Sequence, residues 1–366
     1  MKHTILLFIG AVALALPGLS QPTTAFPALT PAKGWTPAQI DSIAEKVAAF
    51  PANTQLAIAI LRDTNVWFYG VWRDQDTLRS VANSTAVFEI GSLSKVFTAT
   101  LLSAAVEQGQ VSLDQPLREH LSCIAPENPA FTFRQLANHT SGLPRLPPNL
   151  MMSTPENPYR SFDEAKLEQC LGTVLKTRYQ PGEGYSYSNL GAGVLGFALS
   201  RIEKKSYEEL LQESIFQPLG MQHSSTRRET LQDRLIRGQN PNGQVVPNWD
   251  FIALAGAGAI LSSAEDMARF GQANFDTRNP VFHRLQEETF SINPNFKVAL
   301  GWHIILGSNG ERWHWHNGGT GGYSSSMTLD VAQKRGVVIL SNVSAFHSQM
   351  KNIDALCFAL MKTIGQ

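Results

Sequence analysis

The most informative part of this 366-residue chain is the octet Phe88-Glu89-Ile90-Gly91-Ser92-Leu93-Ser94-Lys95. A helix that begins at Ser92 would place Lys95 one turn further along the same face. A serine hydroxyl becomes a good nucleophile when a base takes its proton, and a nearby lysine with a lowered pKa can be that base. The helix N-terminus would also offer backbone N–H groups to a developing oxyanion. Ser-x-x-Lys alone also arises from a capping serine and a surface lysine, so the whole octet is the stronger signal.

Strand and helix patterns lie on both sides of the octet. Thr36-Pro37-Ala38-Gln39 is a capping box with proline at the first helical position. Residues 55–61 and 66–72 are apolar, β-rich runs separated by four polar residues, which predicts a hairpin. Residues 96–106 predict a helix directly after the octet.

The remaining chain divides into a mostly helical middle and a C-terminal region of strands. Helices are predicted at 162–176, 195–213 and 263–270. Strands are predicted at 302–306, 311–316, 323–329 and 336–341, followed by a helix at about 352–364. The predicted fold class is therefore α+β, with an antiparallel sheet formed by both chain ends, flanking helices and a mostly helical inserted subdomain. We expect a single domain over 21–366, with an α/β lobe at about 35–105 and 275–366 and a helical lobe at about 106–274.

The first residues have the pattern of an export signal. A short polar start precedes an apolar run over residues 5–16, which is shorter than the roughly 20 residues that span a bilayer. We expect a signal peptide over about 1–20, cut after Ser20 or Ala25, and an uncleaved anchor helix is the alternative. The expected protein is periplasmic or secreted and has no integral membrane segment after cleavage.

The composition describes a chain that can bury a large core. Hydrophobic residues make up 43% of it, and 30 basic side chains balance 30 acidic ones. Zero net charge argues against a nucleic-acid partner, which would need a basic surface. The three cysteines are too few and too widely spaced for a disulfide scaffold or a zinc site, and we expect no metal or organic cofactor. In an oxidising compartment Cys123 and Cys170 could pair, and Cys357 lies in an apolar segment that predicts a buried thiol.

Two further motifs follow the octet along the chain. They are Tyr187-Ser188-Asn189 and His316-Asn317-Gly318. Together with the octet they resemble, in order, the Ser-x-x-Lys, Tyr-x-Asn and Lys-Thr-Gly elements of class C β-lactamases and their relatives among penicillin-binding proteins and serine esterases. Asn138-His139-Thr140-Ser141-Gly142-Leu143-Pro144 and Ser262-Ser263-Ala264-Glu265-Asp266-Met267 also resemble stretches common in this superfamily. The resemblance implies a β-lactamase/transpeptidase-like fold.

The resemblance also implies catalytic roles. Ser92 would be the acylated nucleophile, Lys95 its activating partner, and Tyr187 a base or a proton shuttle to the leaving group. A phenol titrates near 10, so we expect positive charge from Lys95 and from a protonated His316 to promote ionisation of Tyr187. Which of Lys95 and Tyr187 is the base is left open by the resemblance.

Other positions would hold the substrate. Asn189 would orient Lys95 or a substrate amide. The backbone N–H groups of Ser92 and Gly319 would form the oxyanion hole. Asn317 and Gly318 would line the place where the substrate binds.

Histidine at position 316 departs from the lysine of the lactamase branch. A lysine would pair permanently with a substrate carboxylate, whereas histidine is charged only part of the time near neutral pH. The expected activity is hydrolysis of β-lactams or D-amino-acid-containing peptide amides through an acyl-enzyme, and the expected partner is a small molecule or peptide. A carboxylesterase and a penicillin-binding receptor with little turnover are the alternatives. An ionisation of His316 is expected within about a unit of 6.5 in the pH profile.

Overall fold

The structure is a computed structural model that describes residues 29–151, 154–307 and 310–364. The predicted signal peptide and its cleavage site lie outside the described residues. No helix in the described ranges is both long enough and apolar enough to cross a bilayer.

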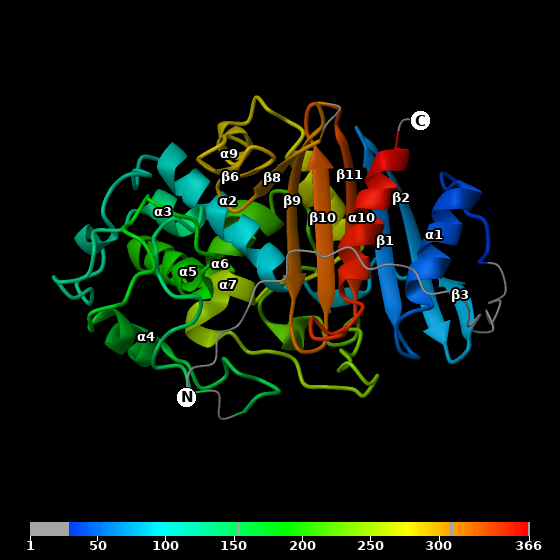
Figure 1. Ribbon diagram of the computed structural model, residues 1–366, viewed down its shortest axis with the longest axis horizontal. Helices are drawn as coiled ribbons and strands as arrows, with labels where there is room; N and C mark the ends of the chain where they lie inside the picture. Colours follow the sequence, from blue (N-terminus) through cyan, green and yellow to red (C-terminus); the bar gives the residue numbers. More distant parts are fainter. Residues whose placement is uncertain (1–28, 152–153, 308–309, 365–366) are drawn as a thin grey trace, which may run out of the picture.

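An antiparallel sheet built from both ends of the chain forms the centre of the fold (Figure 1). Its strands are β1 (Gln55–Arg62), β2 (Asn65–Asp74), β3 (Thr77–Val81), β6 (Phe290–Asn293), β7 (Phe296–Val298), β8 (His303–Leu306), β9 (Arg312–Gly319), β10 (Ser324–Asp330) and β11 (Arg335–Ser341). Within the described residues these strands lie in the order β3-β2-β1-β11-β10-β9-β8-β7-β6. A separate antiparallel pair joins β4 (Val87–Glu89) to β5 (Leu261–Ser263). The pairing of β1 with β11 confirms that both chain ends build the sheet.

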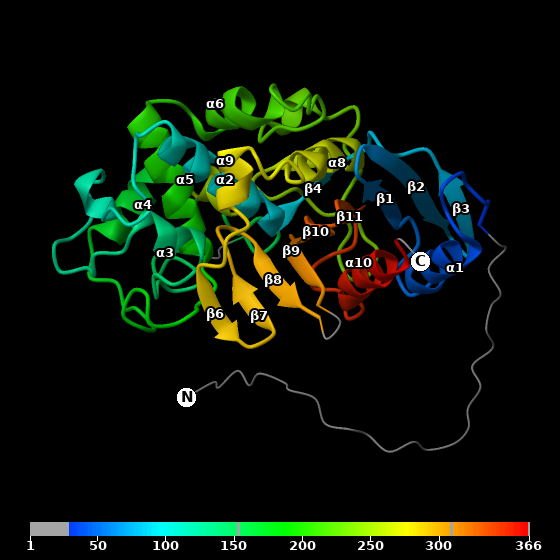
Figure 2. The same ribbon diagram turned by 90° about the horizontal axis from the view of Figure 1, so that it is seen from above.

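Helices cover both faces of the sheet and fill a lobe beside it (Figures 1 and 2). They are α1 (Pro37–Val47), α2 (Ser94–Glu107), α3 (Phe133–Ala137), α4 (Glu164–Leu171), α5 (Asn189–Glu203), α6 (Tyr207–Leu211), α7 (Ala255–Gly258), α8 (Ala264–Ala273), α9 (Pro280–Arg284) and α10 (Lys351–Thr363). Figure 2 shows α1 and α10 on one face of the sheet and α2 and α8 on the other. The predicted α+β class is confirmed.

The sheet separates two hydrophobic cores. Ile58 and Ile60 of β1 pack in the core shared with α1 and α10, while Ala57, Ala59 and Leu61 pack in the core of α2 and α8. Because both faces are covered, β1 is an almost unbroken apolar run. Each fully buried Ile or Leu side chain contributes about 1.5–3 kcal/mol through its removal from water.

The predicted N-terminal elements are confirmed. β1 and β2 form the expected hairpin. The Thr36 hydroxyl accepts a hydrogen bond from the Gln39 N–H at 3.3 Å, and the Gln39 amide oxygen accepts one from the Thr36 N–H at 2.8 Å. This reciprocal capping box fixes the start of α1.

The predicted helix at 195–213 has the wrong bounds. α5 begins earlier, at Asn189, because the Ser188 hydroxyl caps it by accepting the Gly191 N–H at 2.8 Å. It ends at Glu203, because Lys204 adopts a left-handed conformation with φ of 55°. The predicted helix at 162–176 is also too long, since α4 covers Glu164–Leu171.

Cys123 and Cys170, which the sequence left free to pair in an oxidising compartment, form no disulfide in the structure. Cys123, Cys170 and Cys357 are all free thiols. Burial raises the pKa of Cys123, and it raises that of Cys170 to about 11, which disfavours the thiolate that disulfide exchange requires. Cys357 is fully buried, as predicted.

Candidate active site

The octet forms a tight turn between β4 and α2. Residues Gly91–Leu93 make a 3₁₀ turn, and α2 begins at Ser94, two residues after the predicted start. Gly91 has a φ of 52°, and a Cβ at this position would lie 2.5 Å from the backbone nitrogen of Gly319. Glycine is therefore needed both for the backbone conformation and for the close approach of β9. The turn sets Ser92 where α2 meets the end of β9.

Lys95 is buried against Ser92. Its Nζ lies 3.0 Å from Ser92 Oγ and 2.7 Å from the carbonyl oxygen of Ala257 in α7. Burial lowers the pKa of Lys95 well below its usual range, and the positive charge of Arg145 lowers it further. The neutral amine, which is the form that accepts a proton, is therefore accessible at this position.

Tyr187 is the third side chain of the predicted site, beside Ser92 and Lys95. An interaction with the Ser92 side chain partly opposes the rise of its pKa, and Lys95 Nζ is 4.9 Å from its ring centroid. The next residue fixes its position, because Ser188 donates its hydroxyl to the Pro144 carbonyl at 2.7 Å and its N–H to His139 Nδ1 at 3.2 Å. Burial raises the pKa of Tyr187. The predicted ionisation of Tyr187 near neutral pH is therefore wrong, because desolvation outweighs the nearby positive charge.

His316 lies beside Tyr187, as predicted, with 6.2 Å between the ring centroids. It is 1% exposed, and its Nδ1 is 2.6 Å from the Asn317 carbonyl oxygen. A carbonyl only accepts, so Nδ1 carries the proton and Nε2 is a buried acceptor without a hydrogen-bond partner among the described residues. Burial first, and then His303 and Lys95, lower the pKa of His316 well below its usual range. The predicted protonated His316 is therefore wrong, and the ring is a neutral imidazole.

Asn189 does not contact Lys95, which was one of its two expected partners. Asn189 donates its amide to the Tyr159 hydroxyl at 3.1 Å, whereas Lys95 donates to Ser92 and Ala257. The Asn189 Oδ1 is buried and has no partner in the described part of the chain.

Asn317 lies on the opposite face of β9 from His316. It donates its amide to Asp354 of α10 at 2.8 Å. Successive side chains of a strand point to opposite faces, so the neighbour of His316 points away from the catalytic face. The Asn317 side chain therefore packs against α10, and only the Asn317 backbone is left for the predicted substrate-binding role.

Gly318 and Gly319 bring the backbone of β9 against the octet. A Cβ on Gly318 would overlap the carbonyl oxygen of Ile90 and would lie 2.6 Å from Ser325 Oγ. The backbone nitrogens of Gly319 and Ser92 therefore belong to adjoining segments, which is the arrangement that the predicted oxyanion hole needs.

Gly318→Ala is expected to slow turnover by about 100-fold, because the added methyl group would push β9 away from Ile90 and displace one oxyanion donor. We also expect it to destabilise the fold by about 1–3 kcal/mol through overpacking. The rate of acylation by a fluorophosphonate and a thermal melt measure the two effects. Gly172→Ala, at the end of α4, is the matched control, and equal acylation rates in the two variants would contradict the prediction.

Three side chains to which the sequence assigned no role contact this site. His139 lies 4.4 Å from Tyr187 between ring centroids, and His303 lies 5.2 Å from His316. The Arg145 guanidinium carbon is 5.2 Å from the Tyr187 ring centroid. His139 and Arg145 lie in or directly after the stretch at 138–144 that resembles the superfamily, so the sequence offered a signal for these two residues. No sequence pattern indicated His303. Across the described ranges, no group of three or more His, Cys, Asp or Glu side chains is arranged to hold a metal ion.

Comparison with known proteins agrees with this arrangement. The Beta-lactamase family model matches residues 43–356. The chain belongs to the Beta-lactamase family. Its serine hydrolase relatives include D-alanyl-D-alanine-carboxypeptidase/endopeptidase AmpH of Escherichia coli (strain K12), which is 26% identical over 354 residues and covers 87% of each chain. Protein flp of Staphylococcus aureus (strain NCTC 8325 / PS 47) is 24% identical over 84% of this chain, which spans only 63% of the length of flp.

Solved structures of the Beta-lactamase family share the fold. A beta-lactamase/D-alanine carboxypeptidase from Pseudomonas syringae superposes with a TM-score of 0.73 at 20% identity, covering 90% of this chain and 100% of the other. A class C beta-lactamase superposes with a TM-score of 0.74 at 20% identity, covering 90% and 97%. These structures confirm the β-lactamase/transpeptidase-like fold that the sequence motifs implied.

The pH profile of this Beta-lactamase family protein should depend on Lys95 and not on His316. A lysine that acts as a base must be neutral, so we expect kcat/KM to rise as pH increases through the lowered pKa of Lys95. His316 should be neutral across that range, because its own pKa lies well below its usual value. Measurement from about pH 4 to 10 on the native protein and on His316→Gln checks this expectation. Loss of a limb near 6.5 in His316→Gln would contradict it.

Proposed function

We propose that the protein forms an acyl-enzyme on Ser92 and hydrolyses β-lactams or D-amino-acid-containing peptide amides. The observation that carries this proposal is the buried Lys95 amine 3.0 Å from the Ser92 hydroxyl, with the Tyr187 ring centroid 4.9 Å from the same amine. A desolvated amine beside a hydroxyl is a base that can activate it, and a neutral phenol can supply a proton to a leaving group.

The steps follow from these ionisation states. Neutral Lys95 takes the Ser92 proton while Oγ bonds to the carbonyl carbon, and the carbonyl π pair moves to an oxygen that binds the N–H groups of Ser92 and Gly319. When this intermediate collapses, the C–N bond breaks and the leaving nitrogen takes a proton from the Tyr187 hydroxyl. The proton held by Lys95 then restores the phenol. Water attacks the ester carbonyl while Lys95 takes its proton. The bond between the carbonyl carbon and Oγ then breaks, the proton held by Lys95 passes to Ser92 Oγ, and the acid product leaves.

Two observations favour an amide substrate. The buried Asn189 Oδ1 has no partner in the described residues, which supports the proposal that it accepts a substrate amide N–H. The AmpH relative and the Pseudomonas syringae neighbour are named for carboxypeptidase activity on D-alanine compounds. Their activities support the proposal for this chain by similarity.

A carboxylesterase is the second candidate, and His316 is the observation that favours it. A neutral imidazole replaces the fixed cation of the lactamase element, so the third motif supplies no permanent charge for a substrate carboxylate. Binding of an ester substrate that has no carboxylate would not be weakened by this replacement.

Parallel assays with a fluorescent penicillin, a D-Ala-D-Ala peptide and a short-chain nitrophenyl ester test these candidates. Acylation and product release are followed separately, with Ser92→Ala as the blank. Release of D-alanine or opened penicillin with turnover is expected. Turnover of the ester alone would establish the esterase instead, and one equivalent of acylation without release would indicate a penicillin-binding receptor.

We also propose that the protein is exported, on the strength of the short apolar run at residues 5–16. Expression in a Gram-negative host should yield a mature protein in the periplasm that begins near Gln21 or Phe26. Mass spectrometry of the exported protein measures this N-terminus. An exported protein that still carries Met1 would contradict a cleaved signal.

A further inference from the structure

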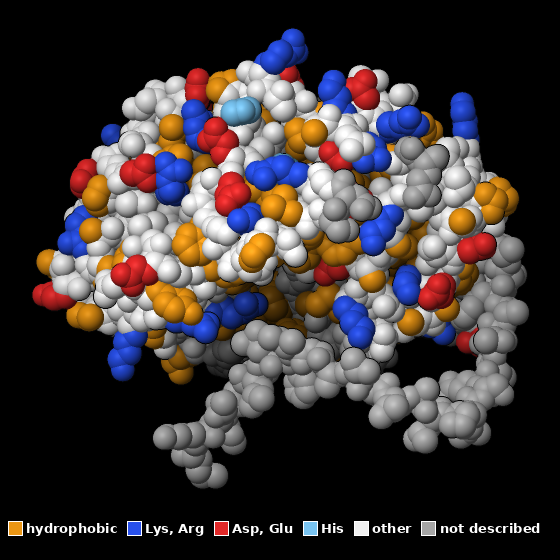
Figure 3. Space-filling view, turned by 45° about the horizontal axis from the view of Figure 1, so that its top comes forward, with side chains coloured by type: hydrophobic (Ala, Val, Ile, Leu, Met, Phe, Trp, Pro, Cys, Tyr) orange, Lys and Arg blue, Asp and Glu red, His pale blue; other side chains and the backbone are white. Residues whose placement is uncertain are grey.

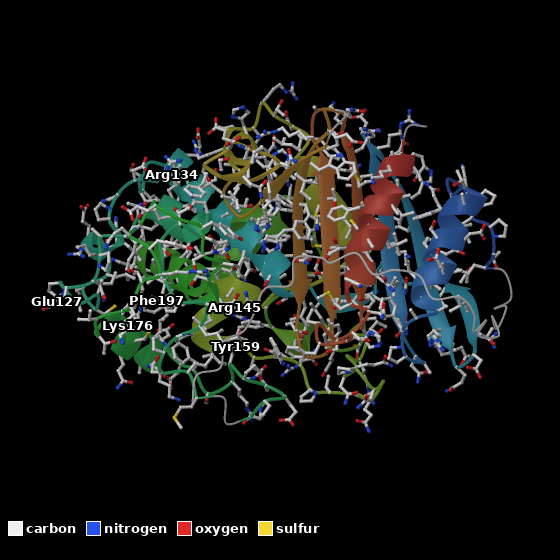
Figure 4. All side chains as sticks on the ribbon, viewed as in Figure 1. Glu127, Arg134, Arg145, Tyr159, Lys176 and Phe197 are labelled. Carbon is white, nitrogen blue, oxygen red and sulfur yellow. The ribbon has the colours of Figure 1, made fainter. Side chains whose placement is uncertain are left out.

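Arg145 presents a cation beside Tyr187. Its side chain is exposed, and its guanidinium carbon lies 5.2 Å from the centroid of the Tyr187 ring. No Asp or Glu of the described residues forms an ion pair with it. Figure 4 labels Arg145 close to Tyr159, the hydrogen-bond partner of Asn189, on the side of the helical lobe near β9.

The backbone of Arg145 belongs to the site. Its carbonyl oxygen accepts the N–H groups of Asn189 at 2.9 Å and of Leu190 at 3.3 Å, at the start of α5. The same helix start positions Tyr187 through Ser188. Arg145 is thereby fixed relative to the catalytic side chains.

The surroundings of Arg145 favour an anion. No carboxylate is among the groups that shift the pKa of Lys95, Tyr187, His139 or His316. The buried Lys95 and the histidines are driven toward their neutral forms, so the permanent charge of this cluster is the guanidinium of Arg145. Elsewhere acidic and basic side chains are mixed, as the face in Figure 3 shows.

We propose that Arg145 binds a carboxylate on the leaving fragment of the substrate and so takes over the task of the cation that is missing at position 316. A guanidinium can hold a carboxylate through two parallel hydrogen bonds. The leaving side is favoured because Tyr187, which Arg145 contacts, is the proton donor to the leaving group. This inference rests on the proposed acyl-enzyme chemistry at Ser92, and it narrows the substrate to compounds with a free carboxylate next to the scissile bond.

Matched probes that differ by one carboxylate test the proposal. The first pair is a D-Ala-D-Ala peptide and its C-terminal amide, compared by kcat/KM. The second set is phenylboronic acid and its 3- and 4-carboxyl derivatives, compared by protection of Ser92 from fluorophosphonate labelling. The native protein should prefer the carboxylate form by about tenfold or more, and Arg145→Gln should bring the ratio close to one. Because each ratio is taken within one variant, any change in the pKa of Lys95 cancels.

Two further variants sharpen the test. Arg178→Gln is the control, since Arg178 is also exposed and lies 5.4 Å from a tyrosine ring, that of Tyr179. The preference of Arg178→Gln for the carboxylate probe over the uncharged probe should equal that of the native protein. Arg145→Glu should reverse the preference in favour of the uncharged probe.

The outcomes separate the two proposals. A carboxylate preference that is absent from the native protein, or is retained in Arg145→Gln and Arg145→Glu, would overturn the role of Arg145. Failure of a fluorophosphonate to label the native protein would overturn the proposed function instead. If neither peptide is hydrolysed but labelling occurs, the boronate ratios alone decide the role of Arg145.

Discussion

Ser92→Ala is expected to abolish covalent labelling by fluorophosphonate and penicillin probes and to reduce hydrolysis by at least about 10⁴-fold. The variant removes the atom that forms the acyl bond, and no repositioning of Lys95 or Tyr187 can replace it. The fold should survive, because the serine side chain is half-buried and the loss of its hydrogen bonds costs about 1 kcal/mol.

Mass spectrometry of the Ser92→Ala protein measures the loss of covalent labelling, and a thermal melt measures the change in stability. Ser112→Ala, at an exposed serine, is the matched control and should label as the native protein does. A label that persists on Ser92→Ala would show that another residue is the nucleophile.

Lys95→Met is expected to slow acylation of Ser92 by about 10³-fold, the usual loss when a positioned general base is removed. Methionine keeps an unbranched stem of similar length in the buried site, so packing is preserved while the amine is lost. Stability should change little, because the Ala257 carbonyl loses a donor while a desolvated amine is removed from the interior.

Stopped-flow acylation with a fluorophosphonate gives the rate, and the rise of rate with pH assigned to Lys95 should disappear. Lys176→Met, at an exposed lysine, is the control and should acylate normally. Acylation of Lys95→Met within tenfold of the native rate would remove Lys95 from the proposed mechanism and leave Tyr187 as the base.

Patterns confined to neighbouring residues predicted much of this molecule correctly. The capping box at Thr36 and the hairpin of β1 and β2 depend on interactions a few residues apart, so the sequence was sufficient for them. The octet around Ser92 was recognised from its own residues, but the turn that requires Gly91 was not predicted, since the helix was expected to begin at Ser92. The short strands β6 and β7 at one end of the sheet were missed, since three or four residues show no reliable periodicity.

The ionisation states of Tyr187 and His316 could not be predicted from the sequence. Tyr187 and His316 were expected to be charged from their types and motif positions, yet burial by segments distant in the chain keeps them neutral. The direction of Asn317 was undetermined for a related reason. Alternation along β9 separates it from His316, but only the docking of α10 shows which side of the strand faces the site.

The three motifs and their order could therefore be recognised from the sequence, because each motif consists of neighbouring residues. Which of these residues meet, which are desolvated and which cation remains charged depend on how α2, α5, α7 and β9 pack together. Desolvation and Coulomb interaction act through space and not along the chain, so Arg145 could enter the proposed site only once the tertiary structure placed it beside Tyr187.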